Sequence, residues 1–150
     1  MILRPGHWLG RGSLLVEGFS LGETLACDVR VESDDSGLNV TGELTRADSR
    51  AAHLSIRIVQ NDVGTYTIRV QSGGEVFHGT AKLDSVPNLG LLWNDSETVY
   101  VSFALFPVRD GHGCRGFLRD GATTYTWEMA FSLKQDVIKG DNVVSLKRRR

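Results

Sequence analysis

The chain has 150 residues, of which 41% are hydrophobic and 23% are charged, a composition typical of one globular domain. Its net charge is −1, yet the last four residues, Lys147 to Arg150, are all cationic, so the rest of the chain is mildly acidic, which argues against a nucleic-acid-binding groove. Two cysteines, Cys27 and Cys114, are too few for a disulfide scaffold or for a zinc site built from cysteines alone.

Nearly every segment alternates apolar and polar residues, which is the pattern of a β-strand with one buried face. The clearest is Thr124–Leu133, where Tyr125, Trp127 and Met129 share one face and Thr126 and Glu128 share the other. In chain order the expected strands are Trp8–Gly18, Glu23–Ser33, Leu38–Thr45, Ala52–Gln60, Thr65–Gln71, Glu75–Leu83, Leu89–Trp93, Thr98–Val108, His112–Arg119 and Thr124–Leu133.

Short turns separate these strands. Asp34-Asp35-Ser36-Gly37, Ser72-Gly73-Gly74 and Asp110-Gly111 are sequences that favour tight hairpins. Strands joined in this way form an up-and-down meander, and a meander of about eight to ten strands closes because closure removes its exposed edges. The sequence therefore predicts an all-β fold, an antiparallel up-and-down barrel, with a two-sheet β-sandwich as the alternative.

One domain is expected over residues 1–134. Beyond it the alternation fades, and residues 135–150 are expected to form an edge strand or a disordered tail with a basic end. No apolar leader is visible at the start of the chain, and no stretch approaches the roughly 18 apolar residues that span a bilayer. The expectation is a cytoplasmic protein without a membrane span and with reduced thiols.

The first strand opens with Gly6-His7-Trp8, and a Gly-x-Trp at this point resembles the calycin barrels: lipocalins, fatty-acid-binding proteins, avidins and nitrobindin-like haem barrels. The resemblance covers about residues 6–134. It implies a barrel with one end closed by Trp8 and with a ligand cavity at the other end. It also implies a cation from the last strand over the Trp8 ring, for which Lys134 and Arg119 are the candidates.

A barrel of this size encloses either packed side chains or one small ligand. An aromatic set is able to line an apolar pocket: Trp93, Phe103, Phe106, Phe117, Trp127 and Phe131. The leading hypothesis is non-catalytic binding of a small apolar or amphipathic ligand. The residues expected to bind it are Tyr66, Phe103, Arg115, Tyr125 and Trp127, with the two tyrosines and Arg115 as the polar groups that orient it.

Two other functions remain open. The same cavity could serve an enzyme of the isomerase or lyase type, with a Tyr or His as acid and base, although Asp28 and Glu128 fall on the polar faces of their strands. Alternatively, a filled barrel could be a structural or interaction protein that pairs as a homodimer through an edge strand or an aromatic patch.

No spacing of His, Cys or acidic residues matches a metal site, and no metal or cofactor is expected. A haem bound through His112, in the Gly111-His112-Gly113 segment, is the one cofactor hypothesis that the histidines allow. Cys27 and Cys114 both fall on apolar faces, where a thiol is usually inert. A bridge between them would need α-carbons within about 7 Å.

Overall fold

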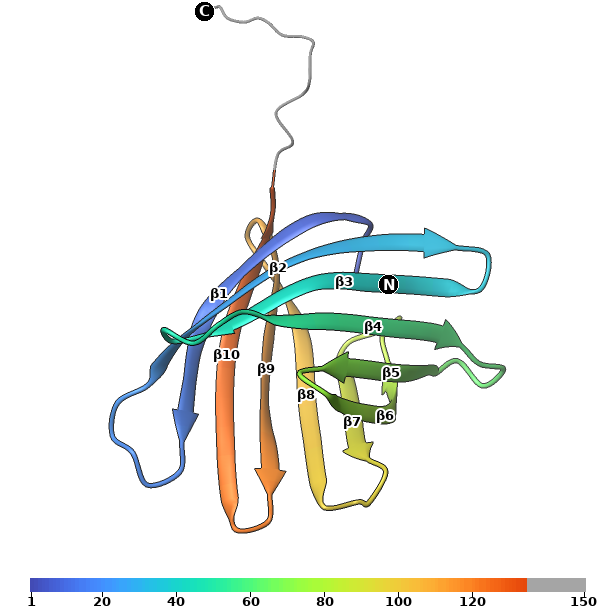
Figure 1. The fold of residues 1–150 in the computed structure, drawn as a ribbon. Coiled ribbons are helices and arrows are strands. Elements are labelled where there is room, and N and C mark those ends of the chain that lie inside the picture. Colours follow the sequence, from blue (N-terminus) through green and yellow to red (C-terminus); the bar gives the residue numbers. More distant parts are fainter. Residues whose placement is uncertain (135–150) are drawn as a thin grey trace, which may run out of the picture.

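The computed structural model describes residues 1–134, and these form ten antiparallel strands closed into a barrel (Figure 1). The strands are β1 (Gly6–Val16), β2 (Glu23–Asp34), β3 (Gly37–Arg46), β4 (Ala52–Gln60), β5 (Tyr66–Ser72), β6 (Glu75–Lys82), β7 (Asn88–Asn94), β8 (Val99–Val108), β9 (Gly111–Asp120) and β10 (Thr123–Leu133). The predicted tail lies outside the described residues. No helix in the described part is long and apolar enough to cross a membrane.

Each strand pairs with its neighbours in sequence, and β1 closes the circle by pairing with β10. In that closing ladder Trp8 lies opposite Leu133, and Val16 lies opposite Tyr125. Hairpin turns at both ends make the barrel an up-and-down meander (Figure 1). The predicted barrel is confirmed, and the alternative of a two-sheet sandwich is wrong, because β1 and β10 leave no open edge.

The alternation of apolar residues places one face of every strand inside the barrel. Val29 and Val31 of β2, Leu38 and Val40 of β3 and Ile68 of β5 are all buried. Between them lie polar side chains that face water. A period of two has this consequence in any closed sheet, because neighbouring side chains point to opposite sides.

The barrel is sealed at the end where β1 begins. Trp8 is 2% exposed, and its indole N–H donates to the Arg4 carbonyl at 2.8 Å. The N-terminal segment crosses this end: the Ile2 amide donates to the Leu83 carbonyl at 3.3 Å, and Ile2 and Leu3 pack against the core. Trp8 therefore closes one end together with the first few residues of the chain.

The partner of the Trp8 ring differs from the expectation. Among the described residues, the cations that lie over rings are Arg46 over Tyr125 and Arg115 over Phe106. Trp8 instead has the imidazole of His112 at 5.1 Å between ring centroids. Arg119 is the second-last residue of β9 and lies at the other end of the barrel, so it cannot reach Trp8.

Candidate functional site

The inner face of the barrel changes in exposure from one end to the other. Near the sealed end the inward side chains are buried; these include Trp8, Leu38, Ile58, Tyr66, Leu83 and His112. Toward the opposite end the inward side chains are only half-buried; these include Leu14, Leu44, Leu54, Val70, Phe77, Phe103, Leu118, Tyr125 and Trp127. Three inward side chains of this half are exceptions, at 7–8% exposed: Leu25, Leu92 and Val101. At the sealed end Phe131 is half-buried and Leu133 is 49% exposed.

An inward side chain of a closed sheet reaches water chiefly through an open end of the barrel. The half-buried set therefore marks the end opposite Trp8 as open, and we call this half of the interior the open half. Its rim consists of the loops that join β1 to β2, β3 to β4, β5 to β6, β7 to β8 and β9 to β10. Three of these loops lie at the bottom of the view in Figure 1: β1–β2, β7–β8 and β9–β10.

Two aromatic rings of the open half, those of Phe103 and Trp127, lie against glycines of neighbouring strands. Gly90, Phe103, Gly116 and Trp127 are direct cross-strand neighbours in one row over β7 to β10. A β-carbon at Gly90 would overlap the Phe103 ring, and one at Gly116 would stand 2.6 Å from the Trp127 indole. The missing side chains let both rings lie along the wall instead of projecting across the interior.

The rim carries a polar group that sequence reasoning missed. Arg46, at the end of β3, donates from Nε and Nη2 to the two carboxylate oxygens of Glu23 at 3.0 and 2.9 Å. Its guanidinium also lies 5.7 Å from the centre of the Tyr125 ring. The Arg46 hydrogen bonds lower the pKa of the Glu23 carboxyl. Glu23 is thus held as a carboxylate, and its charge is matched by Arg46.

The signal for this pair was present in the strand pattern. Arg46 continues the even-numbered inner face of β3 that Leu38, Val40 and Leu44 form. Its direct partner on the neighbouring strand β2 is the buried Leu25. The expected strand, Leu38–Thr45, ended one residue before Arg46. One more residue of strand would have placed the guanidinium on the inner register at the rim.

Three of the five predicted site residues meet in the open half. Phe103 (β8), Tyr125 and Trp127 (β10) face the interior there and are half-buried. The other two lie elsewhere. Tyr66 is at the sealed end, 6% exposed, and its hydroxyl donates to Asp84 at 2.7 Å. Burial, together with that bond, raises the pKa of Tyr66 to about 12.

Arg115 lies on the outside of the barrel. Its guanidinium is 4.9 Å from the centre of the Phe106 ring and 3.4 Å from a carboxylate oxygen of Glu128. Arg115 alternates on β9 with the inward Cys114 and Gly116, so its position follows from the period of two. The predicted role of orienting a ligand inside the barrel is therefore not one that Arg115 can perform from here.

His112 does not fit a haem ligand. Its imidazole is 6% exposed, stacks on Phe131 with ring centroids 5.0 Å apart and an angle of 12°, and contacts Trp8 on its other side. Burial lowers the pKa of His112, so the imidazole is neutral. The side chain lies buried at the sealed end, including its Nδ1 atom, so a haem would reach the imidazole only if the surrounding residues unpacked.

The two cysteines are free thiols. Cys27 is 7% exposed, and burial raises its pKa to about 12; burial also raises the pKa of Cys114. A thiol that stays protonated is a poor nucleophile and a poor metal ligand. Both residues act as small apolar side chains of the barrel interior, as predicted.

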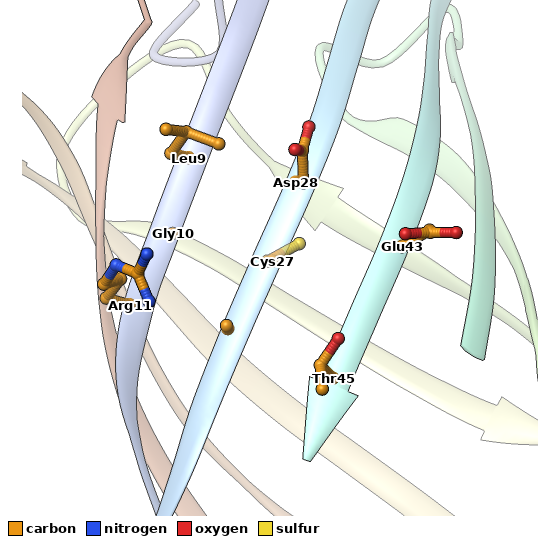
Figure 2. A pocket seen from close by; sticks show the side chains of 8 residues that line it. Leu9, Gly10, Arg11, Cys27, Asp28, Glu43 and Thr45 are labelled. Atoms are coloured by element: carbon orange, nitrogen blue, oxygen red, sulfur yellow. The ribbon is translucent and has the colours of Figure 1, made fainter. Parts of the chain in front are cut away.

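Two hollows lie on the outer wall rather than inside. One, of about 130 Å³, is lined by residues of β1 to β3 including Arg11, Asp28 and Thr45 (Figure 2). The next, of about 400 Å³, shares Asp28 and Glu43 and extends to His53 of β4. Within residues 1–134, no three His, Cys, Asp or Glu side chains are grouped as a metal centre requires. These hollows are shallow dips in a charged sheet surface.

Comparison with known proteins finds no match: no family model, no curated protein and no solved structure corresponds to this chain. The resemblance to the calycin barrels therefore stands on Gly6, Trp8 and the strand order, and it stays a prediction.

Proposed function

We propose that the protein binds a small apolar or amphipathic molecule in the open half of the barrel, without catalysis. The observation that carries the proposal is the exposure gradient of the inner face: most inward apolar side chains near Trp8 are buried, and most of those toward the opposite end are half-buried. A folded protein gains stability by burying such side chains. Inward apolar groups left in contact with water are a surface that a ligand would cover.

The arrangement of the walls supports this function. Phe103 and Trp127 lie along the wall over Gly90 and Gly116 rather than across the interior. Burying apolar area contributes about 25 cal/mol for each Å², so an aliphatic chain that covers these rings and Leu14 would supply most of the affinity. The polar rim would keep a ligand headgroup in water.

Catalysis is less well supported. The groups whose pKa values are raised or lowered by burial, His112, Tyr66 and the two cysteines, lie among packed side chains. In the open half, Glu23 is held as a carboxylate by Arg46, which makes it a weak base. An isomerase or lyase would need an acid or base in the cavity with a pKa near neutral.

The homodimer stays a prediction. The outer face of β7 to β9 does carry exposed apolar side chains, Leu89, Leu91, Tyr100 and Phe117, and these are the residues through which an aromatic patch would pair. Nothing in the described residues specifies what covers them. Light scattering on the purified protein measures the association state directly.

The test of ligand binding uses two neighbouring leucines of β1. Leu14 is on the inner register opposite Trp127, and Leu15 is on the outer face, 42% exposed. Calorimetric titration with decanol should show binding to the wild type and to Leu15→Trp, and a large loss for Leu14→Trp because its indole fills the open half. Equal binding by both variants, or no binding by the wild type, overturns the proposal. Phe103→Leu, which adds no volume, provides a second variant if Leu14→Trp does not fold.

A further inference from the structure

The charges of the described residues are unevenly distributed between the two ends of the barrel. The rim of the open half, residues 17–23, 46–52, 72–75, 94–99 and 119–123, carries seven acidic residues and three arginines, a net charge of −4. All other described residues together carry nine acidic residues and nine lysines or arginines. The acidic excess of residues 1–134 therefore belongs to the rim of the open half.

Besides Glu23, two of these acids stand on the inner register of the barrel. Glu75 begins β6 and pairs with Ser72, in line with the inward Val70 and Phe77. Asp120 ends β9 and lies opposite Val99, whose register continues inward to Val101 and Phe103. Neither carboxylate makes an ion pair with another described residue, whereas Asp95 contacts His78 at 2.7 Å and Glu17 lies 3.8 Å from Arg119.

The one arginine on the inner register is already paired. Both carboxylate oxygens of Glu23 accept hydrogen bonds from Arg46, so an incoming anion would have to compete with Glu23 for the guanidinium. An anionic headgroup would also lie near Glu75 and Asp120. The rim is therefore unfavourable for a carboxylate or phosphate and favourable for a positive charge.

The wall below the rim is also suited to a cation. Trp127, Phe103 and Phe77 line the open half, and the faces of aromatic rings attract ammonium groups, with Trp the strongest. The Tyr125 ring already has the Arg46 guanidinium near it. Negative charges above and aromatic faces below act on a headgroup in the same direction. The acidic rim and the aromatic rings together favour a ligand with a positive charge.

We propose that the ligand is a cationic amphiphile, an amine or quaternary ammonium group on an apolar body, whose apolar part enters the open half while its charge stays at the acidic rim. This rests on the proposed function and specifies the ligand class. The expected preference is an electrostatic one: a few unscreened charges at about 10 Å are worth roughly tenfold in affinity at low ionic strength.

Three probes share a ten-carbon alkyl group and differ in the charge of the headgroup, so they separate the effect of charge from that of apolar contact. They are decyltrimethylammonium, decanol and decanoate, each titrated below its critical micelle concentration. The cation should bind the wild type roughly tenfold more tightly than decanoate at low ionic strength, with decanol between them, and high salt should reduce the difference. Decanoate that binds as tightly as the cation overturns the inference and leaves the proposed function intact. Failure of all three probes instead removes the proposed function.

Charge variants test where the preference arises. Glu75→Gln combined with Asp120→Asn should reduce the preference for the cation severalfold and leave decanol binding unchanged. Asp35→Asn combined with Asp62→Asn removes the same charge from exposed turns at the sealed end and should have little effect. Arg46→Gln frees Glu23 and should strengthen binding of the cation. Equal effects of the two double variants would show a net-charge effect and contradict a role of the rim.

Discussion

The ring of Phe103 lies directly on Gly90 of the neighbouring strand, so closely that a β-carbon at position 90 would overlap three of its ring atoms. Gly90 and Phe103 are direct partners in the β7–β8 ladder. The same relationship holds at the sealed end, where a β-carbon at Gly10 would stand 2.6 Å from the ring of Phe131. The barrel thus uses glycines to lay large rings along its wall at both ends.

We predict that Gly90→Ala forces Phe103 away from the wall and into the open half. It should destabilise the fold by about 1–3 kcal/mol, as overpacking does, and weaken decanol binding. Adding Phe103→Leu should recover part of the stability. Gly10→Ala is the matched control: it should cost stability through Phe131 and leave decanol affinity unchanged. The opposite result, loss of affinity in Gly10→Ala alone, would place the ligand at the sealed end.

Trp8 should be among the most costly side chains to truncate. It is 2% exposed and its N–H is bonded to Arg4, so Trp8→Ala should lower the free energy of unfolding by about 3–5 kcal/mol. Trp93 is on the outer register of β7, and Trp93→Ala should cost no more than about 1–2 kcal/mol. Urea unfolding of both variants measures the difference, and similar costs would contradict a sealing role for Trp8.

His112 should make the fold sensitive to acid. Burial lowers its pKa in the native state, while in the unfolded chain the pKa is near 6.5. The unfolded state therefore binds more protons as the pH falls below about 6.5, and stability decreases over that window. In His112→Phe, which keeps a ring against Phe131, this part of the pH dependence should disappear.

The measurement is urea unfolding at a series of pH values between about 7 and 5, compared between variants. His53→Gln, which removes an exposed histidine of β4, is the control variant. A His112→Phe variant that retains the full slope would mean that folding does not lower the pKa of His112.

Tyr66 should prove structural. Its hydroxyl donates a hydrogen bond to Asp84 at the sealed end, so Tyr66→Phe should cost about 1.5–3 kcal/mol, the usual loss for a hydrogen bond to a charged group. Because this site is far from the rim, decanol affinity should not change. Unchanged stability together with weakened binding would return Tyr66 to the ligand site.

The fold followed from the sequence because a period of two carries nearly all the information that a meander needs. The expected ends of β4 agree with the structure, and those of β2, β3 and β5 are displaced by about one residue. Short turns between alternating segments leave only sequential pairing, and sequential pairing of ten strands leaves closure as the way to avoid an edge. No long-range information was required.

The site was less accessible to the same reasoning. Alternation places Phe103, Tyr125 and Trp127 inside, but it assigns no height along the barrel, so Tyr66 was grouped with them although it lies at the other end. Arg115 was included for its charge although its register points outward. The Arg46–Glu23 pair joins residues of two strands at their ends, where sequence patterns are weakest.

The most direct test of the central claim is a map of where an apolar chain binds. In amide-resolved NMR spectra, titration with decanol should shift the signals around Leu14, Phe103, Leu118 and Trp127 in a saturable way, and leave those around Trp8, Ile58 and Leu83 in place. Saturable shifts confined to the sealed end or to the outer wall, or no saturable shifts at all, would contradict a ligand site in the open half of the barrel.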